Sequence, residues 1–206
     1  MSVSLHRICS RYTELKFMIK IKDIVQIQTG IYEKPVAFGE VYYVQARHFD
    51  ENRNFISTVT PELPLDNKLE KHFLQKGDVL VASKGYDHFA VAYEGIIKPA
   101  VASSMFIVLR PKTEISPQYL AWFINHPNTQ NILTGNSKGT ALPSITKSDI
   151  GDLTISIPNL KIQETILKIN ELRKKEKTLK VGIENLKDVI IQNTILKYLN
   201  TDKNNV

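Results

Sequence analysis

Hydrophobic residues follow two different periods along this chain, and the period changes between Pro158 and Leu160. Before the change, apolar residues come in short runs bounded by Gly, Pro and polar clusters, which is typical of strands joined by loops. After it, they recur at steps of three and four residues, the spacing of one face of an α-helix. The pattern predicts an α+β fold: one mixed α/β domain with a strand-rich core, followed by a long C-terminal helix.

Several short segments of the first part are predicted to be strands. Residues 79–82 and 89–93 are apolar runs on either side of a Gly-containing loop, so they are expected to form a hairpin. Residues 100–109 form the longest run and are predicted as one strand, in which small residues mark a place of close approach. Residues 19–27 alternate apolar and polar positions and are either a strand or a short helix. The remaining strand candidates are residues 41–44 and 153–157.

A helix is predicted after Ser116, because Ser is a good N-cap and Pro117 suits the first helical position. Its aromatic residues at helical spacing are expected to pack in the core. The helix is predicted to end at His126, since the residue before a proline avoids the α region.

Two other segments carry local signals. Thr146 and Asp149 have the spacing of a capping box, which predicts a short helical turn before the strand at residues 153–157. Residues 51–69 are polar and contain two prolines, so an irregular surface loop is expected there.

The segment from residue 159 to 200 is predicted to be one long helix. About 40 residues at 1.5 Å each give a rod of roughly 60 Å, longer than a domain of this size needs. Its apolar seam contains a three-residue phase slip near Glu176. A narrow seam favours pairing with a partner helix as a coiled coil, and the alternative is a helix that folds back through a break near Gly182. The seam residues are Ile162, Ile166, Ile169, Leu172, Leu179, Ile183, Leu186 and Ile190.

Charge and cysteine content narrow the function classes. Lys and Arg outnumber Asp and Glu by 27 to 21, and this net charge of +6 suits a polyanionic partner such as nucleic acid. The single cysteine, Cys9, excludes an internal disulfide framework and a cysteine-based zinc site, so a cytoplasmic setting is expected. No apolar run reaches the roughly 20 residues that a membrane helix needs. Residues 1–17 lack the pattern of a secretion signal and are expected to be a disordered extension, or to precede the natural start.

Recognised catalytic motifs are missing from the sequence. Residues 135–140 have the wrong order for a phosphate-binding loop, and there is no Gly-x-Ser-x-Gly nucleophile elbow. The five histidines show no metal-ligand spacing, so neither a metal nor a cofactor is expected. The sequence therefore favours a protein that binds and positions over one that catalyses a reaction.

Five ordered segments resemble the DNA specificity subunit of type I restriction-modification systems. The stretch from Gly139-Thr140 to Pro158 and Gln163 is similar to the family's closing signature. The run Lys76-Gly77-Asp78-Val79-Leu80, continuing to Lys84-Gly85, is similar to its central signature. The other three segments are residues 21–30, 99–110 and 115–125. The resemblance covers about residues 19–200, which is one target recognition domain and its helix.

The resemblance implies that the chemistry belongs to other polypeptides. The family's usual subunit carries two recognition domains and two helices, so a single copy implies a half-length subunit that forms a homodimer through antiparallel helices. Such a dimer would present two identical domains to a bipartite site on double-stranded DNA. DNA methyltransferase subunits, which carry S-adenosylmethionine, would pack on it, and a restriction-translocase subunit can join them. The chain itself is expected to be non-catalytic and to hold no cofactor.

These expectations assign a role to each part of the chain. Residues 1–17 are an extension, 18–158 the recognition domain, 159–200 the helix for spacing and dimerisation, and 201–206 a tail. The candidate DNA contacts are polar residues at loop mouths, where Arg or Lys can pair with guanine and Gln with adenine. They are Gln45, Arg47 and His48 after the first strand run, Lys84, Tyr86 and His88 in the hairpin loop, and Lys138 and Thr140 in the closing signature.

Three other functions remain open. One is a protein–protein scaffold whose basic surface is incidental, and a second is a small DNA-modifying enzyme with a site assembled only by the fold. A third keeps the family but makes the chain an orphan subunit that redirects or interferes with a resident system. The recognised DNA sequence is not readable from residues whose placement depends on the fold.

Overall fold

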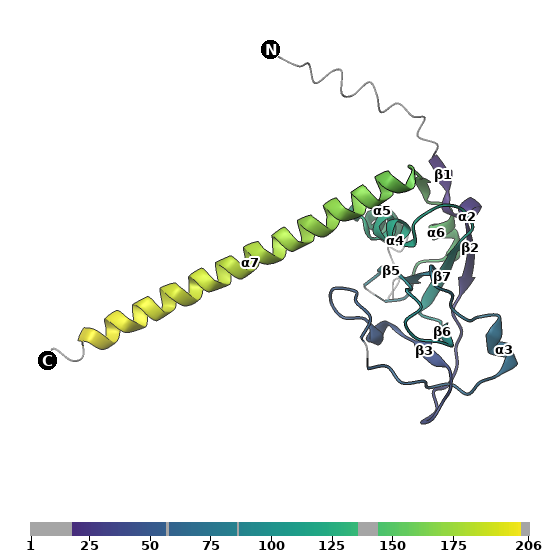
Figure 1. Cartoon of the computed structure of the whole chain (residues 1–206), viewed down its shortest axis with the longest axis horizontal. Helices are drawn as coiled ribbons and strands as arrows, with labels where there is room; N and C mark the ends of the chain where they lie inside the picture. Colours follow the sequence, from purple (N-terminus) through teal and green to yellow (C-terminus); the bar gives the residue numbers. More distant parts are fainter. Residues whose placement is uncertain (1–17, 57, 86, 136–143, 203–206) are drawn as a thin grey trace, which may run out of the picture. The chain divides into compact units, whose positions relative to one another are not determined.

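A computed structural model describes residues 18–56, 58–85, 87–135 and 144–202, with side chains described up to residue 197 (Figure 1). The chain divides into two compact units, Met1–Gln163 and Glu164–Val206. The described strands all lie in the first unit and most of the C-terminal helix forms the second, which confirms the α+β class. The predicted extension, residues 1–17, lies outside the described residues. Within the described part, no helix is both long and apolar enough to cross a membrane.

A four-stranded antiparallel sheet forms the centre of the first unit (Figure 1). Its strand order is β2 (Val25–Thr29), β7 (Phe106–Pro111), β4 (Val79–Ala82) and β5 (Ala90–Ala92). All four residues of β4 are buried, as its Val, Leu and Ala side chains favour. The predicted hairpin is confirmed, because β4 and β5 pair antiparallel.

The longest apolar run is two strands rather than the one predicted. β6 (Ala100–Ala102) pairs in parallel with β3 (Tyr42–Val44), whereas β7 pairs with β2 and β4. The strands are separated by a turn in which the Phe106 amide donates to the Ser103 carbonyl over 2.9 Å. The small residues do mark a close approach, because a Cβ at Gly30 would lie 2.1 Å from the Ser103 carbonyl oxygen. Position 30 therefore accepts glycine alone without a shift of the backbone.

The first described segment contains both of the elements that its sequence allowed. β1 (Met18–Lys20) pairs antiparallel with β8 (Thr154–Ser156), which confirms the strand predicted before Pro158. α2 (Ile21–Ile24) follows β1 directly and buries its first and last residues, and β2 follows α2. The alternation of apolar and polar positions over residues 19–27 therefore arises from a strand, one helical turn and a second strand.

Both predicted helix starts are confirmed by their caps. The Thr146 amide donates to Asp149 Oδ2 over 2.8 Å and the Asp149 amide donates to Thr146 Oγ1 over 3.1 Å, which begins α6 (Lys147–Gly151). The Tyr119 amide donates to Ser116 Oγ over 3.3 Å at the start of α4 (Pro117–Asn125).

The predicted core packing of the aromatic stripe of α4 holds for Tyr119 and Leu120, which are buried, whereas Trp122 and Phe123 are half-buried. α4 ends before His126, whose backbone is extended, but a second helix, α5 (Pro127–Gly135), begins at the next residue. The proline that ends one helix is thus suited to the first position of the next.

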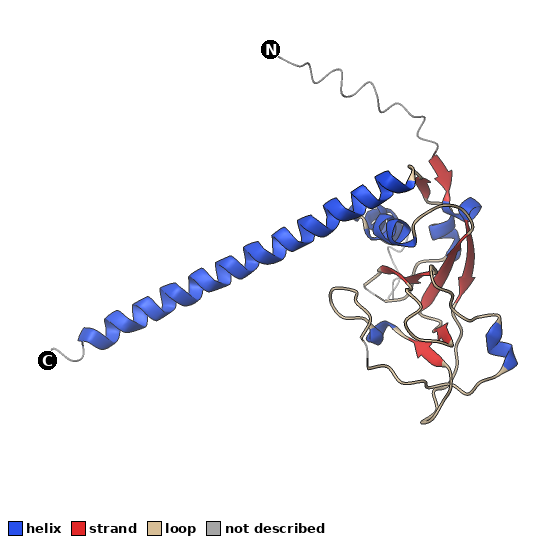
Figure 2. Ribbon diagram, viewed as in Figure 1, coloured by secondary structure: helices blue, strands red, loops and turns tan. Residues whose placement is uncertain are grey.

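Loops make up most of the chain between β3 and β4 (Figure 2). Within them lie η1 (Ala46–His48), a short 3-10 helix, and α3 (Asn67–Glu70). Leu63 is buried and its amide donates to the Val41 carbonyl over 3.0 Å, so the loop predicted at residues 51–69 enters the core at this point.

A buried ion pair joins the start of β4 to β7. Arg110 Nε donates to Asp78 Oδ1 over 2.8 Å and Nη2 donates to Oδ2 over 2.7 Å. Asp78 Oδ2 also accepts the Gln75 amide, and Arg110 Nη2 reaches the Phe73 carbonyl. The side chain of Asp78 is 1% exposed and that of Arg110 is 22% exposed. The acidic residue of the central signature is therefore a structural anchor.

α7 (Leu160–Asp202) is a continuous helix of 43 residues, as the sequence predicted, and it has no break at Gly182. Gln163 in its first turn is fully buried. Its Oε1 accepts the Ser116 amide over 2.8 Å and its Nε2 donates to the Pro158 carbonyl over 2.7 Å. These bonds explain why the boundary between units falls after Gln163, whereas the change of period in the sequence lies at Pro158.

The predicted seam of α7 is largely open to solvent. Ile162 and Ile166 are half-buried, and the other six seam residues expose between 52% and 65% of their surface. Further apolar side chains on other faces of the helix are also exposed: Val181, Val189, Ile191, Ile195 and Leu196. The helix therefore carries more apolar surface than a single narrow seam.

Candidate nucleic-acid interface

The turn after β3 brings the first three candidate residues together. β3 is held by its parallel pairing with β6, and the chain then enters η1 at Gln45. The Gln45 amide donates to His48 Nδ1 over 3.2 Å, and the Gln45 side chain accepts from the His48 backbone. This reciprocal cap fixes the orientation of both side chains, because each satisfies an otherwise unpaired group of the short helix.

Glu62 is the residue that organises this turn. Arg47 Nη2 donates to Glu62 Oε1 over 2.9 Å and to Oε2 over 3.1 Å. Gln45 Nε2 approaches Glu62 Oε2 at 3.4 Å. The Arg47 side chain is 59% exposed and that of Glu62 is 22% exposed. We refer to Gln45, Arg47, His48 and Glu62 as the Glu62 cluster.

The Glu62 cluster borders a pocket of about 330 Å³. The pocket combines a guanidinium, a carboxylate and two threonine hydroxyls, so it offers both hydrogen-bond donors and acceptors. This mixture suits the edge of a base pair, which also presents donors and acceptors side by side. The lining residues are Arg47, His48, Ile56, Thr58, Val59, Thr60 and Glu62.

His48 lies at the base of the cluster and is 8% exposed. Burial, and next the charge of Arg47, lower the pKa of its imidazole below the ordinary 6.5, while Glu62 acts in the opposite sense. Arg47 Nε points at His48 Nε2 over 3.2 Å while the Gln45 amide points at Nδ1. A neutral imidazole accepts at one nitrogen only, so the Gln45 amide and the Arg47 Nε–H compete for it.

The His48→Asn variant is expected to lose less stability than the parent when the pH is lowered into the mildly acidic range. In the parent, His48 contributes stability fully above about pH 6.5 and loses it as the pH falls toward the lower folded-state pKa, because the unfolded chain binds the proton more readily. Asparagine keeps an acceptor for the Gln45 amide and does not titrate. Melting temperatures of both proteins between pH 7.5 and 5.5 measure the effect, and parallel curves would contradict it.

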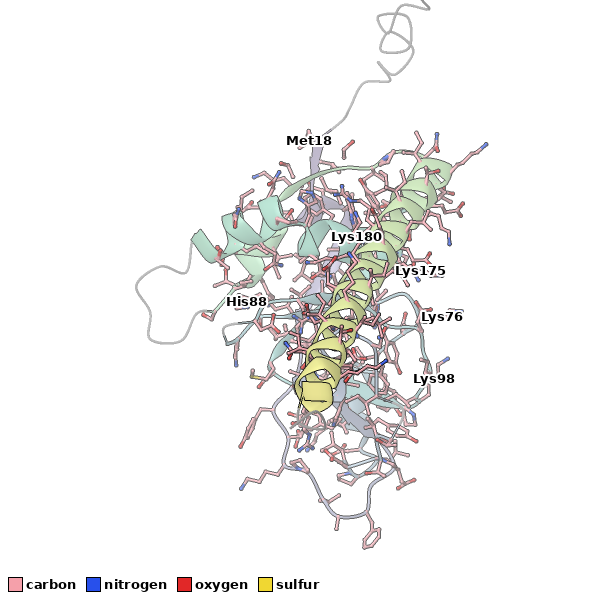
Figure 3. The ribbon with its side chains drawn as sticks, turned by 90° about the vertical axis from the view of Figure 1, so that its left-hand side faces the viewer. Met18, Lys76, His88, Lys98, Lys175 and Lys180 are labelled. Atoms are coloured by element: carbon pink, nitrogen blue, oxygen red, sulfur yellow. The ribbon has the colours of Figure 1, made fainter. Side chains whose placement is uncertain are left out.

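The second candidate group is only partly placed at the surface. Lys84 is exposed, and Tyr86 lies outside the described residues. His88, labelled in Figure 3, is buried, with its Nδ1 3.1 Å from the Ala82 carbonyl oxygen. The expectation of a loop-mouth side chain is wrong for His88, because the pairing of β4 with β5 already begins beside it: the Ala82 amide donates to the Phe89 carbonyl. His48 is also buried, because its ring accepts the Gln45 amide and so caps the turn.

The last two candidates, Lys138 and Thr140, lie outside the described residues. The residues that follow them are placed next to the hairpin loop. Ser144 forms a backbone bridge with Lys84, and the Ile145 amide donates to the Ser83 carbonyl over 2.7 Å. The structure thus joins the end of the closing-signature loop to the exposed Lys84.

Among the residues that the structure describes, no metal cluster competes with this region. No group of three or more His, Cys, Asp or Glu side chains is placed to hold a metal ion within the described ranges. A larger pocket of about 460 Å³ contains none of the candidate residues, and most of its lining is apolar. It is formed by Ile19, Ile24, Thr113, Glu114, Ile157, Pro158, Asn159 and Leu160.

Sequence reasoning missed Glu62. It lies 15 residues after Arg47, in a loop whose polar and proline content predicted only irregular structure. No local pattern signals the contact, because it arises when the backbone of Glu62 and Leu63 pairs with Val41 just before β3.

Solved structures of two related proteins have the same fold. The HsdS subunit from Thermoanaerobacter tengcongensis has a TM-score of 0.57 and 16% identity, over 79% of this chain and 43% of that chain. A structure described under the complex assembly and conformational transition of the type I R-M system has a TM-score of 0.52 and 16% identity, over 80% of this chain and 40% of that chain. The chain thus spans about two fifths of the length of the structures it matches.

Sequence comparison gives the family directly. No curated protein matches the chain. The family profile described as Type I restriction modification DNA specificity domain matches residues 14–185, which include the β-rich unit, the Glu62 cluster and more than half of α7. Because that match covers most of the sequence, the protein belongs to the family of type I restriction-modification DNA specificity domains.

Proposed function

We propose that this chain is the sequence-specific DNA recognition subunit of a type I restriction-modification complex. The family match over residues 14–185 is the observation that carries the proposal. The net charge of +6 and the solvent-facing Arg47 of the Glu62 cluster support it, since binding to DNA requires neutralisation of phosphates and polar groups that read base edges.

In this role the first unit reads DNA and α7 sets the spacing between recognition units. The exposed apolar side chains of α7 support pairing with the same helix of a second copy, which would place two recognition units on a bipartite site. Methyl transfer and cleavage are then carried out by partner subunits in the cytoplasm, and this chain supplies no catalytic group. The related structure described under complex assembly of the type I R-M system supports the existence of such partners.

Selection from a library of random DNA duplexes tests the proposal. The purified full chain is expected to enrich one motif, with two inverted copies at a fixed distance if the chain acts as a dimer. Affinity for the enriched duplex should fall steeply with salt, with a slope in log–log form of about 0.9 per phosphate contacted. Salt-sensitive binding without an enriched motif would mean a nonspecific basic surface, and absence of binding would favour a protein–protein scaffold.

A further inference from the structure

We infer that Arg47 and Glu62 together read one G·C base pair in each half-site. The inference rests on the proposed function and names the base pair that this part of the recognition unit takes. A guanine presents two acceptors, N7 and O6, in the major groove, and the paired cytosine presents an N4 amino donor beside them. The pair of residues offers the complementary set, with donors on Arg47 and a carboxylate acceptor on Glu62.

Arg47 has free donors at the end of its side chain. Its Nε faces His48 and its Nη2 donates to Glu62, so one edge of the guanidinium is held by the protein. Nη1 makes no hydrogen bond to any residue that the structure describes, and more than half of the side chain is exposed. An arginine held through Nε and Nη2 keeps its Nη1 donors available for the N7 or O6 acceptor of a guanine.

Glu62 makes a phosphate an unfavourable occupant of this place. A carboxylate 2.9 Å from the guanidinium largely cancels its charge and repels phosphate oxygens. The same carboxylate is a good acceptor for an amino group, and its 22% exposure leaves a side open to solvent. A base edge with both acceptors and a donor therefore fits better than the DNA backbone.

Both residues are carried by backbone that is held to the same strand. The Val41 amide donates to the Leu63 carbonyl and the Leu63 amide donates to the Val41 carbonyl, each over 3.0 Å. Val41 leads directly into β3 and so to Arg47, and the Val36 amide fixes the Glu62 carbonyl over 2.7 Å. The distance between donor and acceptor is therefore set before DNA arrives, which specific readout favours.

The Asp78–Arg110 pair shows what a purely structural ion pair looks like in the same unit. There the carboxylate is 1% exposed, and the guanidinium also bonds to the Phe73 carbonyl. Arg47, by contrast, is 59% exposed and borders the polar pocket. The two pairs differ in their openness to a ligand.

Duplex selection with variants tests the inference. The parent is expected to enrich a motif with one strictly G·C position that depends on this pair. Arg47→Ala and Glu62→Gln should each relax that single position, with discrimination against the other base pairs falling about tenfold or more. Glutamine is close to glutamate in shape and keeps an acceptor for Arg47. Glu62→Gln therefore still tests the base preference at this position if Arg47→Ala folds poorly. Lys98→Ala, which removes an exposed cation labelled in Figure 3, should leave the motif unchanged.

A modified base identifies the contacted atom. Placing 7-deazaguanine at the identified position removes the N7 acceptor, so binding by the parent should weaken about tenfold while binding by Arg47→Ala should not weaken further. If both variants select the parent's motif, the inference is overturned and the proposed function stands. If Arg47→Ala weakens binding equally for all sequences and lowers the salt slope by about one unit, Arg47 is a phosphate contact and the inference is also overturned. If the parent enriches no motif, the proposed function fails with it.

Discussion

Replacing Asp78 with asparagine is expected to lower the free energy of unfolding by about 3 kcal/mol, a figure typical of breaking a buried ion pair. The change leaves the guanidinium of Arg110, which is only 22% exposed, without its charged partner. It also weakens the acceptor of the Gln75 amide and loosens the link between β4 and β7 at the centre of the sheet. Urea unfolding followed by circular dichroism measures the loss.

Asp152 is the matched control for this variant. Its carboxylate also contacts two basic side chains, Lys20 and Lys22, but all three are about half exposed. Hydrogen bonds from Lys22 and Lys20 hold the pKa of Asp152 at about 2, so it is ionised at neutral pH as well. Because exposed ion pairs contribute little, Asp152→Asn should unfold near the parent's midpoint. Equal losses for both variants would show that burial does not decide the effect.

The second large effect is expected on assembly. Changing Leu179 and Ile183 to lysine should convert a dimer into monomers, because both side chains lie on the exposed seam of α7. Burying a leucine or isoleucine contributes about 1.5 kcal/mol or more, so two changes in each of two chains remove roughly 6 kcal/mol. That corresponds to an increase of more than a thousandfold in the dissociation constant of the dimer. Light scattering after size exclusion measures the mass directly.

The control on this helix is Lys180→Ala, since Lys180 forms an exposed ion pair with Glu176 and is labelled in Figure 3. Its loss should leave the mass of the particle unchanged. A parent chain that elutes as a monomer at micromolar concentration would contradict pairing through α7. A dimer that survives both lysine substitutions would place the contact elsewhere.

Features set by neighbouring residues were predictable from the sequence. The caps at Ser116 and at Thr146 with Asp149, and the hairpin of β4 and β5, depend on residues a few positions apart. The division of residues 100–109 into two strands could not be predicted, because it depends on pairing with β3 and on the backbone of Gly30. Both lie far away in the sequence. An apolar run shows burial but not which partner strand each half takes.

The candidate site divides in the same way. Gln45, Arg47 and His48 are neighbours in one turn, so a single strand end predicted their meeting. Glu62 joins them through long-range backbone pairing, and His88 turns inward because β4 and β5 already pair beside it. Residue type and loop position were enough to indicate polar side chains. The burial of the His48 and His88 imidazoles depends on packing against distant residues, which spacing along the chain does not show.

The Glu62 cluster and most of the pocket beside it are formed by two segments, residues 45–48 and 58–62, that lie outside the four-stranded sheet. The sheet is stabilised by β4, β7 and the Asp78–Arg110 pair, none of which contributes a side chain to the cluster. In the proposed role, readout by Arg47 and Glu62 depends on residues other than those that stabilise the sheet, whereas the buried His48 contributes to stability. If the cluster reads DNA as proposed, new target sequences can arise by exchanging exposed side chains such as Arg47 while the sheet stays constant, and these positions can be varied as a small library.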